Sequence, residues 1–136
     1  SLLPQFWTNI KSNMVKGLIV DDKPSISKLI FQILSKSYDV AYKEDGLQAI
    51  AWLQAGNIPD LIITDLQMPN MDGFELIKRV KESGLFRDIP IVVVSSKDSS
   101  ADRIKCLKMG ADDYVIKPFN PEELQIRVER ILKRQT

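Results

Sequence analysis

The chain has 136 residues, and its 19 basic and 18 acidic side chains leave a net charge of +1. This length suits one domain with a sizeable core. The near balance of basic and acidic side chains argues against a nucleic-acid-binding protein, which normally has a strongly basic face. No apolar run approaches the roughly 18 residues of a membrane span, and no basic segment leads into the apolar core of a signal peptide.

Two residue types narrow the chemistry further. Cys106 is the only cysteine, which excludes an intrachain disulfide and indicates a protein of the reducing cytoplasm. The sequence contains no histidine, so histidine-dependent catalytic triads, histidine metal sites and a phosphohistidine in this chain are excluded.

Residues 1–13 differ in pattern from the rest of the chain and are interpreted as an N-terminal extension or a segment added by cloning, with the domain expected over 14–136. Short apolar runs then alternate with segments that have helical spacing. The expected strands are 15–20, 38–42, 60–64, 91–94 and 114–116. The apolar residues of the intervening helices are Ile26, Leu29, Ile30, Ile33 and Leu34, then Leu47, Ile50, Ala51 and Leu53, then Phe74, Ile77 and Val80, then Ala101, Ile104 and Leu107, and finally Leu124, Val128, Ile131 and Leu132.

Five strand–helix units of this kind indicate an α/β fold. Strands that alternate with helices form a parallel sheet covered on both faces, and the Val- and Ile-rich runs suit strands buried on both sides. Asn120, Pro121 and Glu123 mark the start of the last helix as a capping box.

Four of the five expected strands end in polar side chains. Asp21 and Asp22 follow the first strand, Asp65 the third, Ser95 the fourth and Lys117 the fifth. The carboxyl ends of parallel strands share one edge, where ligands bind in open sheets. We therefore expect these side chains to converge.

Such a cluster suits a cation and a phosphoryl group. Carboxylates in one place repel each other unless a cation lies among them, and oxygen ligands without His or Cys favour Mg²⁺, with Mn²⁺ as an alternative. A lysine and a hydroxyl at the same place suit phosphoryl oxygens. The residues predict a magnesium-dependent phosphoryl site in which Asp65 is the candidate nucleophile.

Five motifs, in this order and spacing, resemble those of response-regulator receiver domains, the phospho-acceptor modules of two-component signalling. The resemblance covers about residues 15–134, and it implies a flavodoxin-like sheet of order 2-1-3-4-5 with five flanking helices. The motifs are Val20-Asp21-Asp22, residues 60–65, residues 68–73, residues 89–95 and residues 110–119.

The resemblance also implies roles at the phosphoryl site. Asp65 would accept a phosphoryl group from a phosphohistidine of a sensor histidine kinase or a phosphotransfer protein. Asp22, Asp21 and the backbone carbonyl of Gln67 would bind the metal with Asp65. Lys117, expected before a cis peptide bond to Pro118, would pair with the phosphoryl group or with Asp65.

A switch and an output surface are implied by the same resemblance. Ser95 would move toward the phosphoryl group, and Tyr114 would rotate into the space that Ser95 leaves. The fourth helix, fifth strand and fifth helix would form the output face, most simply in transcription regulation. The resemblance also implies a weak homodimer that forms on activation through charged residues of this face. These residues are Arg103, Asp113, Glu123 and Arg127.

Departures from the family pattern and rival functions bear on this assignment. Lys23 stands where an acid is frequent, and Ser96 stands where alanine is common.

A haloacid-dehalogenase-like hydrolase would need an aspartate at the position of Gln67. A nucleotide- or flavin-binding module would need a Gly-rich loop where Lys23-Pro24 stands. A degenerate receiver would lack the acidic trio. The receiver of a hybrid histidine kinase, a single-domain receiver and a piece of a longer protein remain open.

Overall fold

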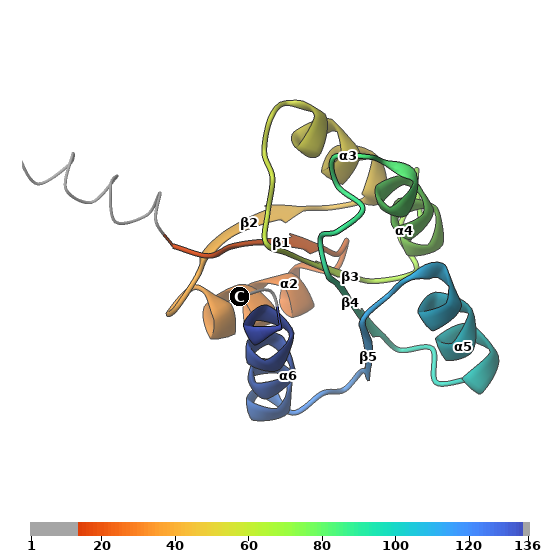
Figure 1. Ribbon diagram of the computed structural model, residues 1–136. Helices are drawn as coiled ribbons and strands as arrows, with labels where there is room; N and C mark the ends of the chain where they lie inside the picture. Colours follow the sequence, from red (N-terminus) through yellow and green to blue (C-terminus); the bar gives the residue numbers. More distant parts are fainter. Residues whose placement is uncertain (1–13, 135–136) are drawn as a thin grey trace, which may run out of the picture.

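A parallel sheet forms the centre of the molecule (Figure 1). The computed structural model describes residues 14–134, so the interpretation of residues 1–13 lies outside the described part. The spatial strand order β2-β1-β3-β4-β5 confirms the predicted topology. The strands are β1 Lys16–Val20, β2 Asp39–Lys43, β3 Leu61–Thr64, β4 Ile91–Ser95 and β5 Asp113–Ile116.

Helices cover both faces of this sheet, as predicted. Within residues 14–134 they are α2 Pro24–Leu34, α3 Gly46–Gln54, α4 Gly73–Glu82, α5 Ser100–Met109 and α6 Pro121–Lys133. Helices α2 and α6 lie on one face, and α3, α4 and α5 lie on the other (Figure 1). Each connection crosses from one parallel strand to another, so all five strands end at the same edge.

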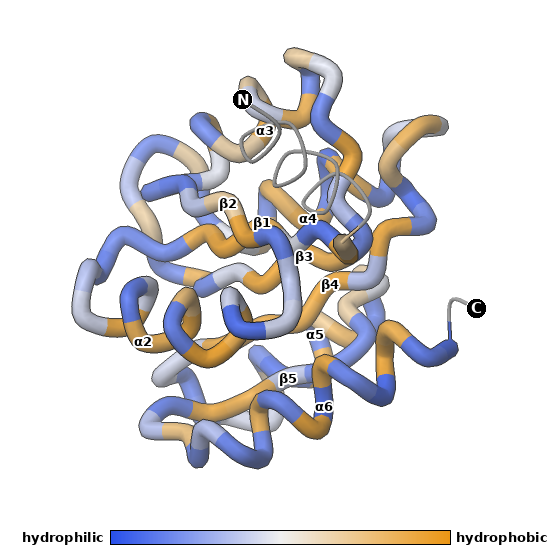
Figure 2. The backbone as a smooth tube through the Cα atoms, turned by 90° about the vertical axis from the view of Figure 1, so that its left-hand side faces the viewer, coloured by the Kyte–Doolittle hydropathy of each residue, from blue (hydrophilic) through white to orange (hydrophobic). Residues whose placement is uncertain are grey.

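The three central strands separate two hydrophobic cores. Alternate side chains of a strand point to opposite faces, so Leu18 and Ile62 pack beneath α3–α5, whereas Ile19 and Ile63 pack beneath α2 and α6. Figure 2 shows hydrophobic segments gathered in the interior strands, while hydrophobic and hydrophilic residues alternate along α6. This double burial holds the strand ends, and the site built on them, in a rigid frame.

Side-chain caps set where most helices begin. Asp45, Asp72 and Ser99 each accept a hydrogen bond from a backbone N–H in the first turn of α3, α4 and α5. Asn120 Oδ1 caps α6 by accepting from two backbone N–H groups, as expected. The capping box is incomplete, however, because Glu123 Oε1 accepts from Arg127 and not from the Asn120 backbone.

Two helices bury a different face from the one that the apolar pattern suggested. On α3, Leu47 is 55% exposed and Ala49 is buried in its place. On α5, Ile104 and Leu107 are 49% and 46% exposed, and Cys106 is the residue that reaches the core. Burial raises the pKa of the Cys106 thiol to about 11, and Cys106 packs as a small apolar residue of the core.

Candidate functional site

The predicted site residues meet at the carboxyl edge of the sheet. Asp21 and Asp22 follow β1, Asp65 follows β3, Ser95 ends β4 and Lys117 follows β5. Strand β1 lies directly beside β3, so the acidic pair and Asp65 emerge from neighbouring strands. The convergence predicted from the strand ends is therefore present, and it joins residues up to 96 positions apart in the chain.

Three carboxylates form the acidic part of the site. One oxygen from each of Asp21, Asp22 and Asp65 lies within 4.8 Å of the other two, close enough to share one metal ion. Asp21 and Asp65 are buried. Asp22 Oδ1 is also buried and accepts no hydrogen bond, and a buried carboxylate oxygen of this kind is costly unless a cation lies beside it. This all-oxygen set fits Mg²⁺ or Mn²⁺.

Lys117 supplies a buried positive charge. Its Nζ lies 2.9 Å from Asp21 Oδ2 and 3.1 Å from Asp65 Oδ2, and so bridges two of the three carboxylates. The Lys117 backbone N–H donates to the Ser95 carbonyl at 2.8 Å, which fixes the lysine against β4. The expected cis peptide bond between Lys117 and Pro118 is present.

Asp65 is held in place by the chain on both sides of it. The Leu66 backbone N–H donates to Asp65 Oδ1 at 2.7 Å, and the Thr64 hydroxyl donates to the Asp65 carbonyl at 2.8 Å. Gly73, at the start of α4, lies so close to that carbonyl that a side chain there would overlap it. One carboxylate oxygen of Asp65 thus accepts a backbone hydrogen bond, and the other faces the ammonium groups of Lys117 and Lys23.

Ser95 and Tyr114 meet through the backbone of Lys97. Ser95 Oγ accepts from the Lys97 N–H at 3.1 Å, and the Tyr114 hydroxyl donates to the Lys97 carbonyl at 2.6 Å. Tyr114 is only 7% exposed, and this burial raises the pKa of its phenol. The ring that was expected to rotate inward upon activation is already buried in this structure.

Lys23 also belongs to the site. The sequence pattern marked this position only as a departure from the family pattern, in which an acid is frequent there. Its Nζ lies 3.4 Å from Asp65 Oδ2 and 3.6 Å from Asp22 Oδ1. Partial burial lowers the pKa of Lys23, but the charges of Asp65 and Asp22 outweigh burial and raise it, so the group stays protonated. Its position next to the acidic pair was the available signal.

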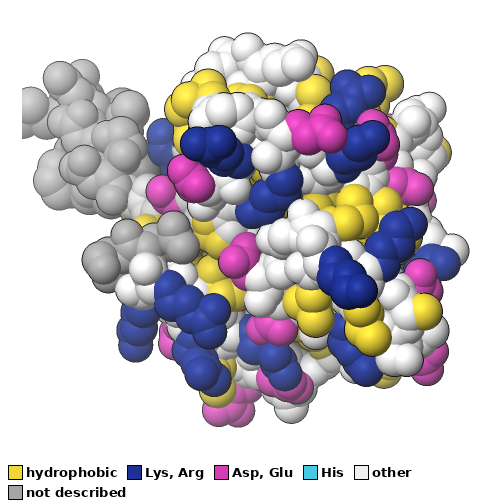
Figure 3. All heavy atoms as spheres, turned by 45° about the vertical axis from the view of Figure 1, so that its right-hand side comes forward, with side chains coloured by type: hydrophobic (Ala, Val, Ile, Leu, Met, Phe, Trp, Pro, Cys, Tyr) yellow, Lys and Arg dark blue, Asp and Glu magenta, His cyan; other side chains and the backbone are white. Residues whose placement is uncertain are grey.

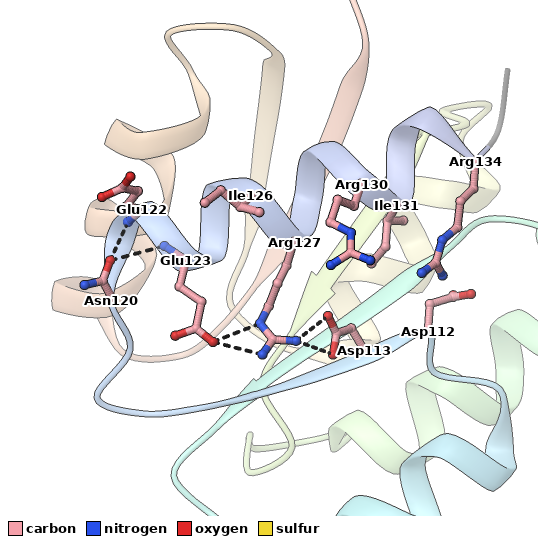
Figure 4. A pocket seen from close by; sticks show the side chains of 10 residues that line it. All are labelled: Asp112, Asp113, Asn120, Glu122, Glu123, Ile126, Arg127, Arg130, Ile131 and Arg134. Atoms are coloured by element: carbon pink, nitrogen blue, oxygen red, sulfur yellow. Dashed lines mark hydrogen bonds and ion pairs between the residues drawn. The ribbon is translucent and has the colours of Figure 1, made fainter.

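The remaining predicted residues lie in three other places. Gln67 is exposed in the loop between β3 and α4, two residues beyond Asp65. Asp113, Glu123 and Arg127 form one cluster at the junction of β5 and α6, where the guanidinium is bonded to both carboxylates (Figure 4). Arg103 lies on α5 and is not bonded to this cluster.

Comparison with known proteins assigns the family. The model of the response regulator receiver domain matches residues 18–129, which is most of the chain. The chain belongs to the response regulator receiver family. It is therefore a receiver domain of two-component systems, a signalling switch whose family is phosphorylated by histidine kinases, and the haloacid-dehalogenase alternative is wrong.

Individual relatives of this receiver differ in what surrounds the domain. It is 40% identical to the alkaline phosphatase synthesis transcriptional regulatory protein PhoP of Bacillus subtilis, over 88% of this chain and 49% of PhoP. It is also 40% identical to the sensor histidine kinase TmoS of Ectopseudomonas mendocina, over 96% of this chain and 13% of TmoS. The receiver thus spans half or less of these relatives.

A solved structure confirms the flavodoxin-like fold. The chemotaxis response regulator CheY4 of Vibrio cholerae is 34% identical to this receiver and superposes with a TM-score of 0.81, over 88% of this chain and 99% of CheY4.

Within residues 14–134, no helix is both long enough and apolar enough to cross a membrane.

Proposed function

We propose that this receiver, spanning residues 14–136, accepts a phosphoryl group on Asp65. An Asp65 carboxylate oxygen forms the new O–P bond while the P–N bond of a partner's phosphohistidine breaks and its electron pair returns to the imidazole. The observation that carries the proposal is the convergence of Asp65 with Asp21, Asp22 and Lys117 at one sheet edge.

The surrounding residues have roles that agree with their chemistry. Asp21, Asp22, Asp65 and the Gln67 backbone carbonyl would hold Mg²⁺ or Mn²⁺, which would supply neutralising charge for the phosphoryl oxygens when bound. Lys117 is already paired with Asp65 and is placed to pair with a phosphoryl oxygen.

Ser95 and Tyr114 carry the phosphoryl signal to the output face in this proposal. Movement of Ser95 Oγ toward the phosphoryl group breaks its bond to the Lys97 N–H, and Lys97 also holds the Tyr114 hydroxyl. The two side chains are thereby coupled, and phosphorylation shifts an equilibrium between two arrangements of α5, β5 and α6.

The similarity to PhoP supports output through transcription, and the similarity to TmoS supports a hybrid-kinase receiver as the second candidate. We place the protein in the cytoplasm.

Covalent labelling tests this proposal. Acetyl phosphate with Mg²⁺ should add one phosphoryl group, seen by intact-protein mass, and EDTA should prevent the addition. Asp65→Ala should abolish labelling because it removes the attacking oxygen. Asp88→Ala, which changes an exposed carboxylate outside the site, should label normally. Undiminished labelling of Asp65→Ala would refute the assignment.

A further inference from the structure

Lys23 lies in the phosphoryl site without a role in holding the metal or accepting the phosphoryl group. Its ammonium group lies within 3.6 Å of oxygens from both Asp22 and Asp65, which are two of the three candidate metal ligands. The backbone N–H of the same residue donates to Asp21 Oδ1 at 2.8 Å. Lys23 therefore contacts all three carboxylates, twice through its side chain and once through its backbone.

The Lys23 ammonium group and a divalent cation would compete for the same carboxylates, those of Asp22 and Asp65. Asp22 Oδ1 has no hydrogen bond and is the oxygen best placed to bind a metal, yet Lys23 Nζ lies 3.6 Å from it. A divalent cation bound to this oxygen would repel the neighbouring Lys23 ammonium group, so the ammonium group would withdraw as the metal binds. The Lys23 side chain is 52% exposed, which allows it to swing into solvent.

Charge balance gives Lys23 a second effect once the phosphoryl group is present. Three carboxylates face two ammonium groups, from Lys23 and Lys117, so the site carries one negative charge in excess. With a divalent metal bound and Lys23 withdrawn, three carboxylates would face the metal and Lys117, so the charges would balance. Phosphorylation of Asp65 replaces a charge of −1 by one approaching −2, and the return of the Lys23 ammonium group would balance this added negative charge.

We propose that Lys23 is a movable counter-charge that competes with the metal in the unphosphorylated receiver and pairs with the phosphoryl group in the phosphorylated one. The inference rests on the proposed metal and phosphoryl site. Lys23 weakens metal binding when no phosphoryl group is present. It stabilises the state in which both the metal and the phosphoryl group are bound.

Magnesium affinity tests the competition. Calorimetric titration should show that Lys23→Gln binds Mg²⁺ about two- to tenfold more tightly than the wild type, because an exposed ion pair no longer opposes the metal. Lys23→Arg, which keeps the charge, should retain the wild-type affinity. Lys28→Gln is the matched control, because Lys28 is exposed on α2, the helix that Lys23 precedes, and is ion-paired with none of the three aspartates.

Beryllofluoride, which mimics the phosphoryl group on Asp65, tests the second effect. At saturating Mg²⁺, Lys23→Gln should bind beryllofluoride about two- to tenfold more weakly than the wild type, whereas Lys23→Arg and Lys28→Gln should not change. Opposite changes for metal and beryllofluoride cannot arise from a loss of folding alone. Equal magnesium affinities in Lys23→Gln and the wild type, or tighter beryllofluoride binding in that variant, would overturn the inference. If the wild type and every variant fail to bind Mg²⁺, the proposed metal site fails and the inference with it.

Discussion

Single side chains decide the electrostatics of this receiver. Asp65 has one oxygen bound to the Leu66 N–H and the other beside Lys117 and Lys23, so its position and its charge are both controlled. Asp22 contributes an oxygen that is buried without a hydrogen bond. Together these residues leave the metal-free site with more negative than positive charge.

Removal of one carboxylate should therefore stabilise the metal-free protein. We expect Asp65→Asn to raise the Tm in EDTA by about 2–5 °C, because two carboxylates then balance two ammonium groups. Saturating Mg²⁺ should remove the advantage, since it stabilises the wild type by mass action. Thermal melts in EDTA and in Mg²⁺ measure both effects, and a lower Tm of Asp65→Asn in EDTA would contradict the prediction.

Asp45 links two elements through one buried carboxylate. Its Oδ1 caps α3 by accepting from the Gln48 N–H, and its Oδ2 accepts from Asn70 in the loop that follows Asp65, each at 2.8 Å. Burial raises the pKa of Asp45, but these hydrogen bonds outweigh it and hold the pKa below its ordinary value of 3.8.

The lowered pKa makes the contribution of Asp45 depend on pH. It stabilises the fold fully well above pH 3.8, where the carboxyl is ionised in the unfolded chain too, and the effect is lost as pH falls through the lower folded-state pKa. We expect Asp45→Ala to lower the free energy of unfolding by about 1–3 kcal/mol near pH 7. Urea unfolding at several pH values should show this difference shrinking in acid, and a constant difference would contradict the assignment.

At the scale of elements, the start of helix α4 is packed closely against the backbone that follows β3. The Gly73 N–H donates to the Leu66 carbonyl at 2.9 Å, and the space beside Gly73 Cα is filled by the Asp65 backbone. A glycine is required there because of this close approach. The same contact ties the start of α4 to Asp65, the proposed phospho-acceptor.

Gly73→Ala should disturb both stability and phosphorylation. The added methyl group overlaps the Asp65 carbonyl, so we expect a loss of about 1–3 kcal/mol in unfolding free energy and slower labelling by acetyl phosphate. Gly84→Ala is the control, because a methyl group there meets no atom within 4 Å. Chemical denaturation and labelling rates should separate the two variants, and equal behaviour would count against the close packing.

For the whole molecule, the surface formed by α5, β5 and α6 combines apolar and charged groups. Ile104, Leu107, Ile116 and Ile126 are exposed, and hydrophobic side chains reach the surface among Lys and Arg on the side shown in Figure 3. Arg127 bonds to Asp113 and Glu123 of its own chain. A symmetric dimer must therefore add to these internal ion pairs or exchange them, which favours weak association.

We expect beryllofluoride with Mg²⁺ to shift this receiver toward a dimer. Sedimentation velocity should show a shift that weakens as salt rises, since screened surface charges contribute less. Glu123→Lys should abolish the shift by placing like charges beside Arg127, whereas Glu82→Lys, an equal charge change on the exposed side of α4, should not. A strict monomer at high protein concentration would refute this prediction.

Local sequence patterns determined the architecture and most of the site. Short Val- and Ile-rich runs alternating with helical segments were enough for the five-stranded parallel sheet, and a polar residue at each of four strand ends predicted the cluster of side chains at its carboxyl edge. Both inferences depend on regularities within one segment, together with the general rule that parallel strands end at one edge.

Only the tertiary structure decided which partners the side chains have. The apolar pattern of α5 did not reveal that Cys106 faces the core while Ile104 and Leu107 face solvent, because periodicity defines a helix face but not its neighbour. Lys23 reaches Asp65 across 42 positions of sequence. A long flexible side chain can contact anything within several ångströms of its backbone, so its ion pairs depend on how the strands are placed side by side.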